Sequence, residues 1–356
     1  MNQGNESVVW QEITSQPQVW RAVWQRLQGL RDAVSGLLFS ECWDSILFAG
    51  CGSTHYLSLA AANLYQQLTG QRTQGLPSSE IALFPSGVYP DIPPQRVLLI
   101  AVSRSGETSE TLWAVHEHQR RRQPVLTITC RGNSPLATES QAVVAVDEAD
   151  EQSVAQTRSF TSMYLAAQYV AGLAADGREF LAAVEQLPSQ GQSLFDRYGA
   201  LIAQLGGMSW DRIIVLGSGT NYGLACEGML KLKEMALVAS EAYHFLEYRH
   251  GPISLVDEKT LVVGLLSDTA AAIERDVLDD VRRLGGHTLA VGERLPGPEA
   301  ASYIMSLETG LPYLARGVLY LVPLQMLAYH QARARGLDPD RPRHITQAVV
   351  LPAAAP

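Results

Sequence analysis

Two acids and a lysine recur at helical spacing in the segment from Glu227 to Pro252, which reads EGMLKLKEMALVASEAYHFLEYRHGP. An α-helix turns by about 100° per residue, so Glu227, Lys231 and Glu234 share one face. His250 follows in the same segment. A carboxylate near a cation can accept a proton, and a histidine can donate or accept one near neutral pH. The spacing predicts a proton-transfer site, with a solvent-exposed Glu–Lys pair as the ordinary alternative.

Hydroxyl side chains gather in a second stretch, SRSGET, which contains Ser103, Arg104, Ser105 and Thr108 and follows an apolar run. The glycine lets the backbone bend so that several N–H groups can face one ligand, and the N-terminus of a following helix favours an anion. Ser and Thr are also common helix caps, which is the alternative for one such turn alone. Ser53-Thr54 offers the same chemistry after an earlier apolar run. Two such turns favour a phosphate site, and neither matches a nucleotide-binding loop.

The elements that would position these residues form a strand–turn–helix pattern. Apolar runs alternate with glycine- or serine-bearing turns and helical stretches, which is typical of a parallel sheet covered on both faces. Ligands of such sheets bind beyond the carboxyl ends of the strands, where these turns fall. The predicted strands of the first half lie at 45–49, 97–102, 125–129 and 142–146.

The pattern then repeats. DSILFAGCGST at 44–54 aligns with DRIIVLGSGTN at 211–221, an offset of 167 residues, and 97–108 has a weaker counterpart at 261–272. A repeat of this period predicts two similar α/β domains rather than a solenoid. The expected organisation is N-terminal helices at 1–43, a first domain at 44–175, a linker helix at 176–209, a second domain at 210–336 and an extended tail at 337–356.

The two copies differ where chemistry is expected. The second copy carries Glu227, Lys231 and Glu234 where the first copy has Ala60, Leu64 and Gln67. Conversely, Ser-Asp-Thr at 267–269 stands at about the place of the serine-rich turn, and an aspartate there would repel an anion. The first copy is therefore expected to hold the anion and the second to transfer protons.

Composition narrows the class of protein. The chain has 356 residues, 46% hydrophobic and 18% charged, with a net charge of -9, which suits a globular protein and disfavours nucleic-acid or anionic-membrane binding. Its four cysteines show no CxxC spacing, and no signal sequence or long apolar segment is present. We expect a soluble, cytoplasmic protein with no metal site and no cofactor.

The motifs GCGST, SRSGETSETL, EGMLKLKE and HGP together resemble the sugar isomerase (SIS) family over roughly residues 30–350. They are similar to those of the isomerase half of the glucosamine-6-phosphate synthases and of the fructoselysine-6-phosphate-type deglycases. The resemblance implies two flavodoxin-like SIS domains with parallel sheets flanked by helices, and a sugar-phosphate substrate. It also implies a homodimer in which the histidine of one subunit completes the site of the other.

The resemblance also implies roles for individual residues. The SRSGET turn, called the hydroxyl turn below, would bind the phosphate. The Ser53-Thr54 turn would line the sugar, and a backbone group in SVAQT would contact the sugar. Glu234 matches the base that moves a proton between C1 and C2, and His250 the residue that opens the ring or protonates the leaving group. Lys231 and Glu227 match positions beside the base. The implied binding residues are Ser103, Arg104, Ser105, Thr108, Ser53, Thr54 and Val154.

Two departures from the synthase pattern shape the expected function. No glutaminase segment with an N-terminal cysteine precedes the SIS motifs in this sequence, and the tail lysine that forms an imine falls on Gln347, whose amide cannot do so. His344, on the same tail, is a candidate to compensate. These features favour an isomerase/deaminase or deglycase that acts on an amino or amine-linked hexose 6-phosphate. The alternative is a regulatory SIS protein that binds a sugar phosphate without reaction.

Overall fold

The protein is described here by a computed structural model, which covers residues 7–89, 95–297 and 301–351. Residues 1–6 of the expected N-terminal helices and 352–356 of the expected tail lie outside the described residues. The described chain divides into two compact units. Unit 1 contains the chain through residue 17 together with 153–157 and 187–345, and unit 2 contains 18–152, 158–186 and the chain from 346 onward.

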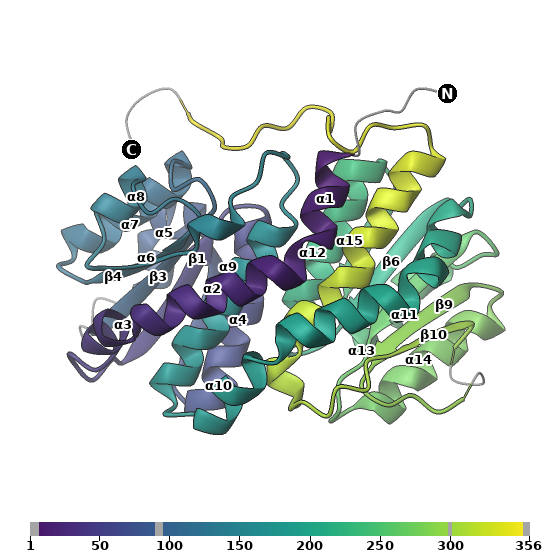
Figure 1. Cartoon of the computed structure of the whole chain (residues 1–356), viewed down its shortest axis with the longest axis horizontal. Helices are drawn as coiled ribbons and strands as arrows, with labels where there is room; N and C mark the ends of the chain where they lie inside the picture. Colours follow the sequence, from purple (N-terminus) through teal and green to yellow (C-terminus); the bar gives the residue numbers. More distant parts are fainter. Residues whose placement is uncertain (1–6, 90–94, 298–300, 352–356) are drawn as a thin grey trace. The chain divides into compact units, whose positions relative to one another are not determined.

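Unit 2 is built on a five-stranded parallel sheet with the order β2-β1-β3-β4-β5, of which β1, β3 and β4 are labelled in Figure 1. The three inner strands are buried along their whole length, which explains their continuous apolar sequences. This order is that of a flavodoxin-like sheet, whose ligand site lies at the carboxyl ends of the first and third strands. The strands are β1 (Ser45–Gly50), β2 (Thr73–Pro77), β3 (Val97–Ser103), β4 (Val125–Thr129) and β5 (Ala142–Ala145).

Helices cover both faces of this sheet. On one face α4 and α9 pack on each other and on the strands, while α5, α7 and α8 cover the other face. Helix α9 is buried along most of its length, as expected of a helix between a sheet and further helices. The helices are α2 (Gln16–Gly29), α3 (Arg31–Leu38), α4 (Ser53–Thr69), α5 (Ser78–Leu83), α6 (Pro85–Val88), α7 (Ser109–Arg120), α8 (Pro135–Thr138), η1 (Asp147–Ala149), α9 (Arg158–Ala174) and α10 (Arg178–Val184).

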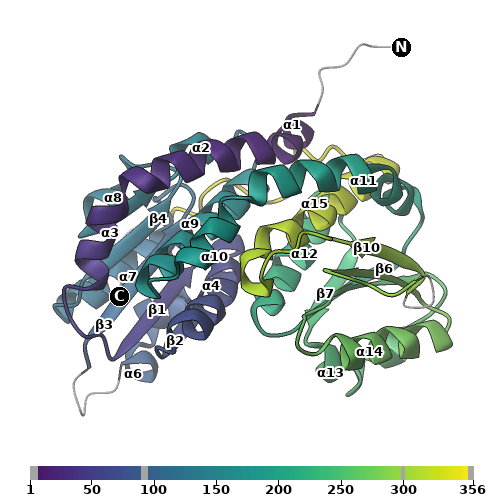
Figure 2. The same ribbon diagram turned by 60° about the horizontal axis from the view of Figure 1, so that its bottom comes forward.

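Unit 1 contains a second parallel sheet with the order β10-β9-β8-β6-β7, which is the same connectivity read from the other edge. Figure 2 shows α13 and α14 on one face and α12, α15 and α11 on the other. The strands are β6 (Arg212–Gly217), β7 (Ala239–Tyr243), β8 (Thr260–Leu265), β9 (His287–Gly292) and β10 (Tyr303–Ser306). The helices are α1 (Val8–Thr14), α11 (Leu187–Gly207), α12 (Thr220–Ala236), α13 (Phe245–Tyr248), η2 (Pro252–Leu255), α14 (Ala271–Arg283), η4 (Tyr313–Ala315) and α15 (Gly317–Ala334).

The internal repeat is visible in the turn that follows the first strand of each sheet. Helices α4 and α12 begin and end at residues 167 apart, each after a glycine with positive φ, 56° at Gly52 and 57° at Gly219. A Cβ on Gly50 would lie 2.5 Å from the backbone of Thr54, and one on Gly217 would lie 2.4 Å from the backbone of Asn221. Both copies therefore require glycine for the helix to approach the strand end this closely.

The start of the chain forms three helices, α1 to α3, and Pro17 lies in the first turn of α2, where its missing N–H costs nothing. The edge strands β2, β7 and β10 have no counterpart in the prediction. Each is short and partly exposed, so none has the apolar run that marks an inner strand.

A buried histidine in unit 2 predicts acid sensitivity. His118 of α7 is fully buried, contacts the Tyr89 hydroxyl through Nδ1 at 2.7 Å and lies 3.1 Å from the Pro124 carbonyl through Nε2. Burial lowers its pKa from 6.5 to about 4. A depressed folded-state pKa contributes stability that is present above pH 6.5 and lost as pH falls towards 4, by about 3 kcal/mol.

The measurement is urea unfolding of the wild type and His118→Gln at pH 7, 5.5 and 4. The wild type is expected to lose more unfolding free energy between pH 7 and 4 than the variant, because glutamine does not titrate in this range. Equal losses would show that His118 is not the group responsible.

Candidate functional site

Glu227, Lys231 and Glu234 lie together on α12, in unit 1. The Lys231 Nζ atom is 3.2 Å from Glu227 Oε1 and 2.5 Å from Glu234 Oε2. The Glu227 and Lys231 side chains are fully buried, while Glu234 keeps 18% of its side chain exposed. Burial alone would lower the pKa of Lys231, but the two carboxylates together raise it. A buried ammonium between two carboxylates is not the solvated helix face that was the ordinary alternative.

Glu234 opens onto a cavity. A space of about 180 Å³ is lined by Glu234, the end of α12 and the chain after α15. Two of its lining side chains are cations, Arg341 and Arg343. Leu237, the C-cap residue directly after α12, also lines this cavity and has a φ of 51°. The most exposed acid of the trio therefore faces a small space whose lining contains a second acid, Asp338, as well as the two arginines.

His250 lies apart from the trio in the chain. It follows α13 in an exposed turn, where its backbone N–H donates to the Glu247 carbonyl at 3.0 Å. Within the described residues, no hydrogen bond or ion pair joins His250 to Glu227, Lys231 or Glu234. Its exposure is compatible with the expectation that it completes the site of another subunit.

The hydroxyl turn after β3 lies in unit 2 and is ordered by its own side chains. Ser103 Oγ accepts a hydrogen bond from the Gly106 N–H at 3.1 Å, and Ser105 Oγ accepts one from the Glu107 N–H at 3.2 Å. Gly106 has a φ of 65° and passes close to Ser134, so a side chain there would clash. Thr108 is the N-cap residue of α7 but makes no side-chain cap bond. The turn lies at the carboxyl end of β3, where this sheet type binds ligands.

Ser53 and Thr54 begin α4 at the neighbouring strand end. The Thr54 hydroxyl donates to the Cys51 carbonyl and accepts from the Cys51 N–H, both at 2.9 Å. The Thr54 hydroxyl therefore stabilises the conformation of this turn. It would contribute to ligand binding through that conformation. Ser53 is buried in the first turn of the helix.

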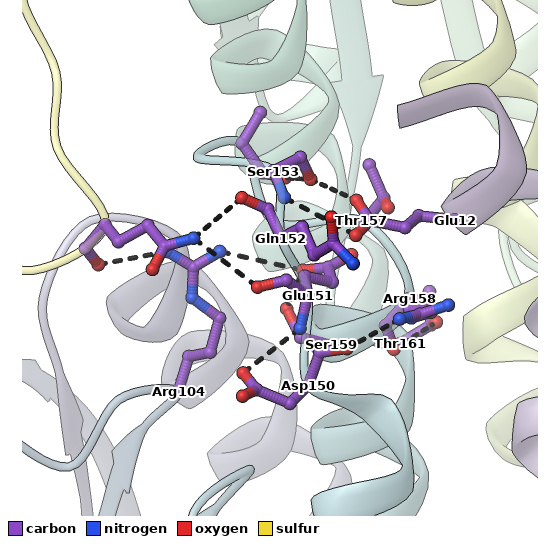
Figure 3. Close-up of polar contacts among 12 residues, drawn as sticks. Glu12, Arg104, Asp150, Glu151, Gln152, Ser153, Thr157, Arg158, Ser159 and Thr161 are labelled. Carbon is purple, nitrogen blue, oxygen red and sulfur yellow. Dashed lines mark hydrogen bonds and ion pairs between the residues drawn. The ribbon is translucent and has the colours of Figure 1, made fainter. Parts of the chain in front are cut away.

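Arg104 makes contacts with protein groups. Its Nη1 lies 3.7 Å from Glu151 Oε2, and its Nη2 donates to the Gln347 carbonyl at 3.0 Å (Figure 3). Glu151 also accepts a hydrogen bond from the Ser159 hydroxyl. Both Arg104 and Glu151 are almost fully buried, at 4% exposure each. The Arg104 guanidinium thus connects the tail, through Gln347, with Glu151, which in turn is hydrogen-bonded to Ser159 at the start of α9.

Gln347 of the tail is bound through its side chain as well as through its backbone carbonyl. Its amide donates to the Gln152 carbonyl at 2.8 Å and to the Glu151 carbonyl at 3.4 Å (Figure 3). Further along the tail, the Val349 carbonyl accepts from the Ser109 N–H at 3.2 Å, and the Leu351 N–H donates to Ser109 Oγ at 2.9 Å. Residues 346–351 thus lie against the start of α7, directly after the hydroxyl turn.

The remaining predicted residues lie in unit 1. Val154 is half-buried in the segment before α9, and His344 is exposed with a φ of 63°. Ser153, beside Val154, donates through its hydroxyl to Glu12 of α1. Glu12 and Glu151 were not singled out from sequence, because each meets its partners only through the fold.

The two parallel five-stranded sheets have the same connectivity, and each has a serine-bearing turn after its third strand in chain order, so the chain is a tandem repeat of one doubly wound α/β domain. The SIS domain profile matches residues 41–172 and 208–334. The chain therefore belongs to the SIS domain family.

Its relatives include glutamine–fructose-6-phosphate aminotransferases (isomerizing). The protein of Gloeobacter violaceus is 32% identical over 365 residues, covering 96% of this chain and 58% of the relative. That of Methanothermobacter thermautotrophicus is 28% identical over 359 residues, covering 98% and 58%. The chain spans less than two thirds of these curated relatives.

Two solved structures are similar over nearly the whole chain. Glucosamine-6-phosphate deaminase of Thermotoga maritima is 29% identical with a TM-score of 0.80, covering 97% of this chain and all of that one. Tagatose-6-phosphate ketose/aldose isomerase of Escherichia coli has a TM-score of 0.84 at 23% identity, covering 98% and 96%, and is evidence for the fold alone.

None of the helices within residues 7–89, 95–297 and 301–351 combines the length and the apolar character that a membrane span requires. Likewise, the described part of the chain contains no group of three or more His, Cys, Asp or Glu side chains able to hold a metal ion.

Proposed function

We propose that the protein moves a proton between C1 and C2 of an amine-bearing hexose 6-phosphate and thereby releases the amine. Glu234 acts as the base, and His250 of a second copy of the chain opens the ring and protonates the leaving nitrogen. Ser103, Ser105 and Thr108 hold the phosphate. The observation that carries this proposal is the buried Glu227–Lys231–Glu234 trio, whose most exposed carboxylate faces a cavity with two arginines.

The reaction balances without an oxidant or a cofactor. With the amine on C2, removal of the C2 proton and its return at C1 give an imine at C2, and water hydrolyses it to fructose 6-phosphate and ammonia. With the amine on C1, transfer in the other direction gives an imine at C1, and hydrolysis yields glucose 6-phosphate and the free amine. One base serves both reactions because the same two carbons exchange the proton.

Two features support an amine-bearing substrate over a free ketose. Gln347 stands where the resemblance places an imine-forming lysine, and its amide is engaged by the Glu151 and Gln152 carbonyls. A substrate that already carries nitrogen needs no such lysine. The 29% identical structure from Thermotoga maritima is named as a glucosamine-6-phosphate deaminase.

The test is a substrate panel followed by NMR. Glucosamine 6-phosphate is expected to give ammonia and fructose 6-phosphate if the amine sits on C2, and a fructosamine 6-phosphate is expected to give glucose 6-phosphate and an amine if it sits on C1. Fructose 6-phosphate and glucose 6-phosphate without amine serve as controls for simple isomerisation. Binding of all four without turnover would contradict the proposal and favour a regulatory SIS protein.

A further inference from the structure

Unit 1 has a second cavity at the carboxyl edge of its sheet. It measures about 380 Å³ and is lined by the segments after β8 and β9, by residues 310–311 and by Arg316. It shares no lining residue with the cavity beside Glu234. The proposed reaction therefore leaves this space unused, although it lies where sheets of this type bind ligands.

A buried guanidinium lines the cavity. Arg316 is fully buried, with Nη2 2.5 Å from Asp268 Oδ1 and Nη1 2.8 Å from Glu293 Oε2. Its Nε has no hydrogen-bond acceptor within the described chain. A guanidinium has five N–H donors, and buried donors without acceptors are rare in folded proteins. A hydroxyl oxygen of a bound ligand would supply the missing acceptor.

The turn in this cavity is related to the phosphate turn of unit 2 but has the opposite charge. Ser267 Oγ accepts from the Ala270 N–H at 3.0 Å, which repeats the contact of Ser103 with Gly106. The next residue is Arg104 in the first turn and Asp268 in the second. Because Asp268 is negative where Arg104 is positive, the turn at Ser267 predicts a ligand with a cationic group, whereas the turn at Ser103 predicts one with an anionic group.

An internal carboxylate also blocks phosphate at this turn. Glu274 Oε2 accepts from the Ser267 N–H at 2.7 Å and from its hydroxyl at 3.0 Å. Its side chain is almost fully buried, so it occupies the donors that a phosphate would use. The cavity is therefore not a second copy of the phosphate site.

The charges are separated between the interior and the rim. Glu293 is engaged by Gly310, Thr309 and Arg316, whereas Asp268 keeps 49% of its side chain exposed. Two carboxylates, one mostly buried and one half-exposed, thus surround the single guanidinium of Arg316. Arg294 at the rim is exposed, and no described carboxylate pairs with it. This pattern suits a molecule with an ammonium at one end and an anionic group at the other.

We infer that this cavity is a second binding site, specific for a small polyol that carries both an ammonium and a phosphate. The ammonium contacts Asp268, hydroxyls accept from Arg316, and the phosphate contacts Arg294. Leu266, Leu295 and Leu311 supply apolar surface for the C–H face of a sugar ring. The choice of ligand class agrees with the proposed function, but the site does not depend on catalysis.

The test uses the full chain carrying Glu234→Gln, so that no substrate is consumed, and titrates it with glucosamine 6-phosphate by calorimetry. Two molecules are expected to bind per chain. Arg294→Gln is expected to weaken one of the two sites by 10-fold or more, and Ala271→Trp, which fills the cavity from α14, is expected to abolish it. Arg283→Gln is the matched control, since it removes an exposed charge from α14 outside the cavity.

Glucose 6-phosphate, which lacks the ammonium, and glucosamine, which lacks the phosphate, are expected to bind this site at least 10-fold more weakly. The proposal is overturned if Arg294→Gln and Ala271→Trp both leave the stoichiometry and affinity unchanged in folded protein, or if glucose 6-phosphate binds equally well. Failure of the proposed function would appear separately, as absence of turnover by the wild type with this site still responding to Arg294→Gln.

Discussion

Replacing Glu234 with glutamine is expected to lower kcat on the accepted amine-bearing sugar phosphate by about 10³-fold. Glutamine has the same shape and can still accept a hydrogen bond from Lys231, but it cannot take a proton from carbon. Substrate affinity should change by less than about threefold, since the lost interaction acts on the transferred proton. The measurements are steady-state kinetics and deuterium exchange at C1 and C2 in heavy water, which should disappear in the variant.

Glu241→Gln is the matched control, because Glu241 is an exposed acid of β7 in the same unit and should leave kcat unchanged. Mixing the inactive Glu234→Gln and His250→Asn chains tests whether two subunits share the site. In a two-fold dimer, each mixed pair keeps one intact site, so random mixing should restore roughly a quarter of wild-type activity. Normal turnover by Glu234→Gln would remove the proposed base, and no recovery on mixing would place His250 and Glu234 in one chain.

The repeated core of the fold was predictable because it depends on local patterns. Helices α4 and α12 have the predicted offset of 167 residues, and the inner strands coincide with continuous apolar runs. The edge strands β2 and β7 were not predictable, since their sequences TQGLP and ASEAY lack such runs. Their pairing is decided by the neighbouring strand rather than by their own composition.

The site was predictable in part, for the same reason. The Glu227–Lys231–Glu234 spacing is local to one helix, so its geometry follows from helical periodicity. Burial of the trio does not follow from it, because the packing of α15 on α12 joins residues about 100 positions apart. Glu12 and Ser153 meet across 141 residues, and Arg104 meets Gln347 across 243. Single-sequence patterns carry no information about such pairs.

Because Lys231 is buried between two carboxylates, its replacement is expected to lower the free energy of unfolding strongly. Lys231→Met removes the ammonium and leaves Glu227 as a buried carboxylate without its cation, next to Glu234. Breaking a buried ion pair on one side costs about 3–5 kcal/mol, because the remaining charge has lost both water and its partner. Urea unfolding should show a loss of this size, and activity should fall with it because the base loses the group that holds it.

Removing the Glu227 carboxylate together with Lys231 separates the effect of the trio on stability from its effect on catalysis. The double variant Glu227→Leu/Lys231→Met is expected to recover most of the lost stability, since apolar side chains of similar volume replace a buried pair at little cost. The first copy already supports this, because α4 has Ala60 and Leu64 at the same positions and buries both. Activity should not return, since Glu234 then lacks its ammonium neighbour. A double variant as unstable as Lys231→Met would mean that Glu227 is not the charge left uncompensated.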